Sequence, residues 1–323
     1  MDMILATNDG QEICTVDYDF DVDLGGTNDF QVSLTYASWI EDIKIGDRIY
    51  TPGTEFGGII KNISSATNTG NIFLKGFTWR GYLDKRIIIP PSGSDYYVAN
   101  GELNTIIGTL VSIPGFVVST ESTGITVSNY QFNRYVTVLE GLEAMLRTVG
   151  FRLDLRYVQT QSGGYVAVSA VKAGLFGDSV EYSQDSMIDF SSTDDQMGVN
   201  HLICLGVGEL KDRTVVHLYA DRNGNISQTK TIGGIDEIVE TFENSGAETA
   251  TLIETGTSKL QEKISKKSFS PSIKKVETEL YIGDIVTGQD YITGNKVTKP
   301  IIQKIVKRSN GVISIDYKIE GQT

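Results

Sequence analysis

The stretch that decides the fold spans residues 45–91 and reads IGDRIYTPGTEFGGIIKNISSATNTGNIFLKGFTWRGYLDKRIIIPP. It opens on an Ile-Gly-Asp tripeptide, which makes a tight turn and leads into a short strand. Two polar segments rich in Gly, Ser, Thr and Asn then separate that strand from two longer apolar segments. Apolar runs bounded by such turn-forming residues predict antiparallel strands, so we expect a three-stranded β-unit here.

The same layout returns near the end of the chain, in residues 282–321. A second Ile-Gly-Asp tripeptide opens it, and the two copies close on Gly81 and Gly321. Internal self-similarity changes a fold assignment, and two copies indicate a duplicated domain rather than a solenoid. The positions that mark the copies, and that we expect to build the repeated ring-forming units, are Ile45, Gly46, Asp47, Ile59, Ile60 and Trp79 in the first and Ile282, Gly283, Asp284, Ile301, Ile302 and Tyr317 in the second.

Each tripeptide unit follows a predicted pair of strands, which extends the repeat to residues 11–81 and 199–321. In the second copy we interpret residues 235–242 and 247–267 as helices. These helices lengthen the connection between the strand pair and the tripeptide.

The character of the chain changes after the double proline that ends the quoted stretch, which indicates a domain boundary. Apolar residues at helical spacing predict helices at 101–112 and 136–149, and Gly150 suits the position after the second one. A hairpin is predicted over 151–171. Helices and hairpin together make a compact α+β domain.

These patterns predict an α+β fold that is mostly β. We expect two β-barrel or β-sandwich domains, at residues 1–91 and 191–323, and an α+β domain at 92–190 inserted between them. The second β domain carries the helical insertion at 235–267. A chain of 323 residues is long enough for each domain to have its own core.

Strand alternation is strictest in residues 16–24, VDYDFDVDL. A period of two places the aspartates on one face and the apolar residues on the other. Four like charges in a row stay ionised only where water reaches them, so this face is predicted to be solvated or to line a lumen. The aspartates are Asp17, Asp19, Asp21 and Asp23.

The aspartate segment also resembles the start of a calcium-binding loop, but two required positions differ. Leu24 takes the place of the glycine at the sixth position, and Phe30 takes the place of the twelfth-position carboxylate. Alternate residues on a strand lie ~6.6 Å apart, too far for neighbours to share one ion closely. No metal site is therefore predicted on this strand.

A net charge of −13 and an isoelectric point near 4.7 argue against a surface that binds nucleic acid. The sequence has no apolar run of membrane-spanning length, and its first residues lack the basic start of a secretory signal. Cys14 and Cys204 lie in apolar strands, and we interpret them as buried free thiols of a protein made in a reducing compartment. A disulfide between them stays open at this point.

Chemistry-bearing motifs are scarce. The only histidines, His201 and His217, lie in apolar strands away from any predicted nucleophile, so structural roles are expected. A zinc site would need every histidine and cysteine of the chain, at no recognisable spacing. No enzymatic activity and no cofactor are predicted. Carboxylate pairs at helical spacing, which solvated helix faces explain, are Glu140 with Glu143 and Glu237 with Glu240.

Residues 77–91, FTWRGYLDKRIIIPP, have the local pattern of an aromatic-rich strand, a turn at Gly81 and a β-branched strand stopped by prolines. The segment, with its G-x-x-x-x-R-x-I-x-P-P ending, also resembles the hub proteins of phage tails and phage-derived contractile particles. The similarity is to the branch found in prophages and phage-tail-like bacteriocins of Gram-positive bacteria. The G-D-I-V segment from Gly283 and the closing Ile-x-Ile-x-Tyr strand resemble the C-terminal part of that family.

The resemblance implies a structural role. Such hubs are trimers at the end of the tail tube, and each subunit contributes two β-barrel-like domains that resemble the tube protein. Three chains then present six similar faces, so the ring can join a sixfold tube to a threefold spike or tail tip.

The expected partners are two further copies of the chain, the tail tube or distal tube-initiator ring, the spike or tail-tip protein, and wedge or tape measure proteins. Stable nucleic-acid binding and membrane insertion are not expected. The expected location is the baseplate of a virion or phage-tail-like particle that assembles in the host cytoplasm.

The resemblance also suggests a role for the aspartate face, because carboxylates that line a bore would repel the phosphates of passing DNA. We expect no appended lytic domain, so no activity is carried over from relatives that have one. Two alternatives stay open. One is a tail-tip cell-wall-binding module that stacks sugars on Trp39, Trp79 and tyrosines, and the other is a tail-associated cell-wall hydrolase.

Overall fold

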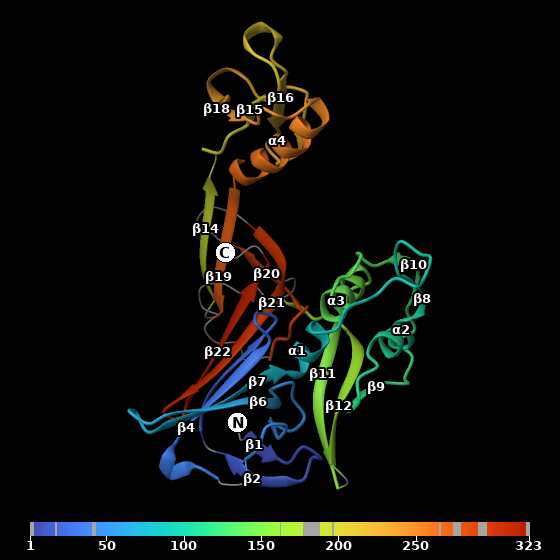
Figure 1. Ribbon diagram of the computed structural model, residues 1–323, viewed down its shortest axis with the longest axis vertical. Coiled ribbons are helices and arrows are strands. Elements are labelled where there is room, and N and C mark those ends of the chain that lie inside the picture. The colour runs from blue at the N-terminus through green and yellow to red at the C-terminus, as the bar shows by residue number, and fades with distance from the viewer. Residues whose placement is uncertain are drawn as a thin grey trace. The chain divides into compact units, whose positions relative to one another are not determined.

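A computed structural model gives the structure of residues 3–16, 18–40, 43–161, 163–176, 188–195, 197–264, 266–273, 279–289 and 296–320. The chain divides into two compact units, which are described separately. Unit 1 comprises Met1–Phe190 and Pro271–Glu320, and unit 2 comprises Ser191–Ser270 and Gly321–Thr323. Strands predominate over helices (Figure 1), so the expected α+β, mostly-β class is confirmed.

An eleven-stranded sheet is the largest element of unit 1 (Figure 1). Its order is β13-β20-β21-β3-β4-β7-β6-β5-β1-β2, and β22 also pairs with β21. Neighbouring strands run antiparallel except β13 beside β20. The strands are β1 (Met3–Ala6), β2 (Glu12–Val16), β3 (Asp19–Leu24), β4 (Asp29–Thr35), β5 (Arg48–Tyr50), β6 (Gly57–Ala66), β7 (Asn71–Thr78), β13 (Leu175–Phe176), β20 (Ile285–Gln289), β21 (Lys296–Ser309) and β22 (Val312–Ile319).

One face of this sheet packs a hydrophobic core, as the strand alternation predicts. On β3 the side chains of Phe20, Val22 and Leu24 are buried, and the aspartates between them are half-exposed. The partner strand β4 repeats the pattern with Phe30 and Val32 inward. Their burial against β7, β6 and β21 therefore fixes the register, because a slip of one residue would turn the apolar set outward.

The C-terminal strands join the N-terminal sheet, which corrects the predicted division into domains. β21 pairs with β3, with Val306 opposite Val22 and Lys307 opposite Asp21. Residues 191–323 therefore do not form one separate β domain, and residues 1–190 lie in a single unit. The physical reason is that the free edge of β3 needs backbone partners, and β21 supplies them from ~280 residues away along the chain. The described strands form an open ladder that ends at β13 and β2, rather than a closed barrel.

Two helices and a hairpin follow in unit 1, where the sequence predicts them. The Thr137 hydroxyl accepts a hydrogen bond from the Glu140 amide and caps α3, and Gly150 follows that helix at φ +73°. The apolar stripes of both helices pack against β11 and β12. These elements are β8 (Val98–Glu102), α2 (Leu103–Leu110), β9 (Phe116–Val118), β10 (Thr126–Gln131), α3 (Val138–Thr148), β11 (Phe151–Thr160) and β12 (Gly163–Lys172).

The segment after β7 is a helix, α1 (Trp79–Asp84), and not the predicted turn followed by a strand. The Thr78 hydroxyl accepts a hydrogen bond from the Gly81 amide and starts the helix. A side chain at Gly81 would lie 2.3 Å from the Asn28 carbonyl oxygen, so this glycine permits close packing and is not a turn residue.

Unit 2 is a four-stranded sheet covered on one face by a helix (Figure 1). The predicted strand pair at 199–220 is present, but it lies in this separate unit. The helix predicted at 235–242 is wrong. The β-branched residues Val239 and Thr241 stand at alternate positions, which favours a strand, and Val239–Glu243 pairs parallel with β15. The elements are β15 (His201–Leu205), β16 (Val215–Ala220), β17 (Ile226–Ser227), β18 (Val239–Glu243) and α4 (Thr249–Lys263).

The predicted helix at 247–267 is present as α4, which ends earlier than expected. Strands β14 (Ile188–Asp195) and β19 (Lys266–Ile273) pair with each other and carry the chain out to unit 2 and back. Cys14 is half-buried and Cys204 is buried, and both are free thiols. Among the described residues, no helix combines the length and the apolar character that a membrane crossing requires.

Candidate functional site: the repeated turns and the polar sheet face

The two Ile-Gly-Asp tripeptides adopt the same turn. Asp47 donates its amide to the Lys44 carbonyl and Asp284 donates its amide to the Tyr281 carbonyl, both at 3.1 Å. Each aspartate carboxylate also accepts from the amide three residues earlier, at 2.7 Å from Lys44 and 2.9 Å from Tyr281. Both aspartates are buried. The tripeptide therefore encodes a closed turn in which the side chain satisfies a backbone donor.

A matched pair of backbone hydrogen bonds also joins each turn to the second strand of its unit, β6 in the first copy and β21 in the second. The glycine in the turn has a positive φ in both copies, +103° at Gly46 and +93° at Gly283, which favours glycine. The bonds are Gly46 to Ile60 at 2.9 Å and Ile60 to Asp47 at 2.8 Å in the first copy, and Gly283 to Ile301 and Ile301 to Asp284 at 2.8 Å in the second.

The likeness continues into the next strands. The register of β6 with β7 shifts between Ile60 and Asn62, and the register of β21 with β22 shifts between Ile301 and Gln303. A bulge therefore follows the same residue of each copy. The duplicated unit is real over turn, hairpin and three strands, but it does not include the strand pair at 199–220.

Most residues that mark the repeat lie inside the protein. They build each copy and are not themselves available for contacts with another chain. Ile45 is an exception, with 56% of its surface exposed. The buried markers are Asp47, Ile60, Trp79, Ile282, Asp284 and Ile301, and the half-buried ones are Gly46, Ile59, Gly283, Ile302 and Tyr317.

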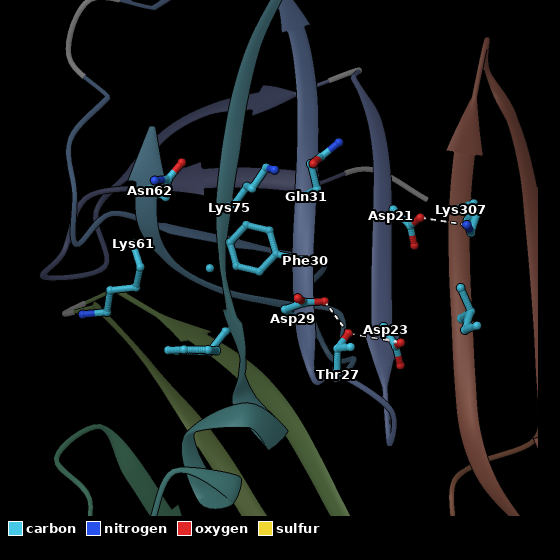
Figure 2. Close-up of a pocket in the computed structure, with 13 residues that line it drawn as sticks. Asp21, Asp23, Thr27, Asp29, Phe30, Gln31, Lys61, Asn62, Lys75 and Lys307 are labelled. Atoms are coloured by element: carbon cyan, nitrogen blue, oxygen red, sulfur yellow. Dashed lines mark hydrogen bonds and ion pairs between the residues drawn. The ribbon is translucent and has the colours of Figure 1, made fainter. Parts of the chain in front are cut away.

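The solvent-facing side of the long sheet carries a row of polar side chains across five strands (Figure 2). Lys307 on β21 stands opposite Asp21 on β3, which stands opposite Gln31 on β4. The row continues to Lys75 on β7 and Asn62 on β6. Residues from both repeat copies and from the β3–β4 hairpin, which lies between the copies in the sheet, therefore form one continuous face.

This face is hollowed into a trough of about 500 Å³ whose charges balance. Three aspartates and three lysines line it (Figure 2). The Lys307 ammonium lies 2.8 Å from the Asp21 carboxylate, and the hydrogen bond and charge of that carboxylate raise the pKa of Lys307. The charged residues are Asp21, Asp23, Asp29, Lys61, Lys75 and Lys307.

The aspartate ladder is consequently a partnered face. Asp23 accepts two hydrogen bonds from the Gln303 amide group, at 2.8 and 2.9 Å, and Asp19 accepts one from the Asn310 amide at 2.9 Å. Asp17 lies outside the described residues. The three described aspartates are half-exposed, as the solvated-face prediction requires, but each is held by a residue of β21 or of the turn after it.

A buried arginine fastens the first repeat copy to the helices that follow. The Arg80 guanidinium lies 2.9 Å from the Glu55 carboxylate and also pairs with Glu143 on α3. Arg80 and Glu55 are almost fully buried. Next to them, Trp79 stacks on Tyr157 of β11 with ring centroids 5.1 Å apart. Trp79 and Arg80 therefore join the end of the first copy to α3 and β11.

A second arginine joins the second copy to the β11–β12 hairpin. The Arg152 Nε lies 3.1 Å from the Asp284 carboxylate, and its Nη1 lies 2.8 Å from Asp154. Asp284 also accepts a hydrogen bond from the Gly174 amide at 2.8 Å. Burial alone would raise the pKa of Asp154, but hydrogen bonds from Arg156 and Arg152 outweigh it and lower that pKa.

No protein-family model matches the chain, and no curated protein is similar to it. Solved structures do match. A chain of the phage P2 baseplate in its activated conformation with Ca has a TM-score of 0.52 at 10% identity, covering 99% of both chains. A topological model of the p2 virion baseplate in activated conformation gives a TM-score of 0.50 at 10% identity, again over 99% of both chains.

A 43 kDa tail protein from prophage MuSo2 of Shewanella oneidensis matches at 15% identity and a TM-score of 0.47, over 99% of this chain and 98% of that one. At such identities the likeness concerns the fold, and the two baseplate structures carry it. The agreement spans the whole chain, including the C-terminal strands and the unit between β14 and β19. This chain has the fold of a phage tail baseplate protein.

Proposed function

We propose that the protein is a structural hub of a tail baseplate, in which three copies form a ring with six similar lobes. The observation that carries the proposal is the duplicated turn-and-strand unit, which repeats in hydrogen bonding and in the position of its bulge. A chain with two such copies lets a trimer match a sixfold tail tube on one side and a threefold spike or tail tip on the other. The full-length fold likeness to baseplate proteins supports this role.

In this arrangement the polar sheet face lines the channel. A surface that balances three aspartates with three lysines in one trough stays hydrated and holds no excess charge that would bind passing DNA. The lysines offset the repulsion that an unpartnered acidic ladder would exert on the phosphates. The role we assign is structural, with no catalytic step, and it places the protein in the baseplate after assembly in the host cytoplasm, beside tube, spike or tip, and wedge or tape measure proteins.

The test is the mass of the purified full-length protein in solution, measured by light scattering, followed by class averages of any particle. The expected result is a mass of three 35.3 kDa chains and a ring with six lobes of two alternating kinds. A protein that remains a single chain at all accessible concentrations, and that does not form a ring when mixed with its tail-tube partner, would rule out the hub role.

One observation favours the cell-wall-binding alternative. Tyr36 and Trp39 line a hollow of about 390 Å³ together with Ile63 and Ile72, and Tyr36 is 43% exposed. Aromatic faces beside apolar side chains are suited to stacking on sugar rings. A co-sedimentation assay with purified cell walls tests it: binding by the wild type that Trp39→Ala abolishes would favour this alternative, and no binding would remove it.

A further inference from the structure

The two histidines of the chain, 16 positions apart in the sequence, meet in unit 2. His201 lies on β15 and His217 on the neighbouring strand β16, two residues apart in register on the face opposite the helix α4. The His201 Nε2 and the His217 Nδ1 lie 2.8 Å from each other. The two imidazole rings therefore direct one nitrogen each at the other ring.

A carboxylate fixes the orientation of the first ring. Glu237 accepts a hydrogen bond from the His201 Nδ1 at 2.7 Å, and its other oxygen pairs with the Lys230 ammonium at 2.6 Å. With the proton of His201 held on Nδ1, the lone pair of Nε2 points toward His217. A carboxylate behind a histidine in this way is the usual outer support of a metal-binding imidazole.

The surroundings give one rigid ligand and one adjustable ligand. His201 is buried and stacks on Tyr219, with ring centroids 4.4 Å apart. His217 is exposed, so water and ions reach the point between the two rings.

We propose that the His201 Nε2 and the His217 Nδ1 bind a divalent transition-metal ion such as zinc, with Glu237 as the positioning residue. Neutral imidazole nitrogens favour zinc, copper and nickel over calcium and magnesium. The described residues contain no group of three His, Cys, Asp or Glu side chains placed to hold an ion, so the protein supplies two ligands and water completes the coordination.

Metal binding requires the His217 ring to carry its proton on Nε2 instead of Nδ1, and the two rings to separate slightly. Two nitrogens at zinc-ligand distance on a tetrahedral ion lie about 3.3 Å apart, so the pair opens by about half an ångström on binding. The exposed His217 ring can make that movement while Glu237 and Tyr219 keep His201 in place. The competing account is a proton shared between the two rings, with no affinity for metal.

The experiment titrates the full-length protein with zinc chloride, followed by calorimetry and by NMR of the histidine ring nitrogens. Because the chain has two histidines, the spectrum contains two rings to follow. We expect one zinc ion per chain, with both rings shifted, and no response of either ring to calcium or magnesium. His217→Gln, which keeps a hydrogen-bonding group beside His201, should abolish binding.

Glu237→Gln should weaken binding about 10- to 100-fold, as loss of an outer-shell carboxylate does elsewhere. Glu243→Gln, on the same sheet but paired with Arg213, is the matched control and should bind zinc like the wild type. Absence of zinc binding by the wild type, or equal binding by His217→Gln, would leave only the shared proton. If His217→Gln fails to fold, wild-type ring signals that do not move with zinc overturn the proposal on their own.

Discussion

The two Ile-Gly-Asp units are alike in their backbone and unlike in their surroundings. Turn, bulge and strand order repeat with hydrogen bonds that agree within 0.2 Å. The first copy is held by an arginine at its own C-terminal end, Arg80, and the second by an arginine of the β11–β12 hairpin, Arg152. The turn is thus specified locally by the tripeptide, whereas the fastening of each copy depends on its place in the fold.

A second difference lies inside the strands. After the bulge, the first copy has Ile63 opposite Leu74, and the second has Lys304 opposite Tyr317. Lys304 is buried, and its ammonium lies 2.9 Å from Glu279 and near the rings of Tyr281 and Tyr317. The same backbone position therefore accommodates either an apolar pair or a buried cation next to aromatic rings, provided the cation has partners.

The fastening of the first copy should be the most sensitive point. Arg80→Met leaves Glu55 buried without its partner, so we expect a loss of about 3–5 kcal/mol in unfolding free energy. Urea unfolding followed by tryptophan fluorescence measures it, because both tryptophans, Trp39 and Trp79, lie in unit 1. Arg147→Met removes an exposed pair with Glu320 and should cost less than about 1 kcal/mol. Equal losses in the two variants would contradict the assignment.

The same variant gives a pH signature. Burial raises the pKa of Glu143, and the charge of Arg80 opposes that rise. Without Arg80 the folded-state pKa rises further above the unfolded value, so the destabilisation is present at neutral pH and shrinks as the pH is lowered toward 4.5. A penalty that stays constant between pH 7 and 4.5 would argue against a charge at this position.

Next in size is the difference between the two turn aspartates. Asp284→Ala removes the turn bond, one of the two carboxylate partners of Arg152 and the acceptor of the Gly174 amide, so a loss of about 3 kcal/mol is expected. Asp47→Ala should cost about 1–2 kcal/mol, the value of a side-chain hydrogen bond to the backbone. Urea midpoints of the two variants test the difference, and identical values would mean that the second copy is not fastened through Asp284.

The glycines of the turns should differ for a steric reason. A side chain at Gly283 would lie 2.6 Å from the Arg152 Cβ, whereas one at Gly46 would lie 3.7 Å from the Asn8 Cβ. Gly46→Ala therefore carries only the strain of its positive φ, about 1 kcal/mol, and Gly283→Ala carries a clash that raises the loss to about 2 kcal/mol. Thermal unfolding ranks them, and the reverse order would refute the close approach of Arg152.

The smallest effect concerns the buried lysine. Lys304→Met makes the second copy resemble the first and should change stability by less than about 1 kcal/mol, because Glu279 is half-exposed and can be solvated. Burial would raise the pKa of Glu279, but hydrogen bonds from Lys304 and Tyr281 and the charge of Lys304 lower it. The wild type therefore loses stability as the pH falls from 4.5 through that lowered pKa, and the variant should lose less. Parallel pH profiles would show that the pair is not formed.

Local patterns predicted the local elements. The alternation of Asp19–Leu24, the apolar stripe of α3 and the Ile-Gly-Asp turns all follow from short-range periodicity and turn chemistry, and the structure has each of them. The strand predicted over 16–24 is shorter than expected, because β3 begins at Asp19. The Trp79–Asp84 helix escaped because its signals oppose each other. Aromatic residues and a glycine favour strand and turn, while the Thr78 cap favours a helix.

The pairing of strands far apart in the chain could not be predicted from the sequence. Nothing in residues 296–309 shows that β21 completes the sheet of β3, because backbone pairing leaves no mark on composition. The charge balance of the trough was not predicted for the same reason, because only the pairing of β21 with β3 brings Lys307 and Asp21 together. The histidine pair is a third case. His201 and His217 are 16 residues apart in the sequence, and only the pairing of their two strands brings the rings together.

The route of the chain into unit 2 has a consequence for how such proteins diversify. The outgoing strand β14 and the returning strand β19 pair with each other, so the excursion begins and ends at neighbouring points of one ladder. A short loop could close that gap, and a foreign module could be spliced there without rerouting the rest of the polypeptide. Exchange of residues 191–270 for another module would thus leave the long sheet and its repeated turns as they are.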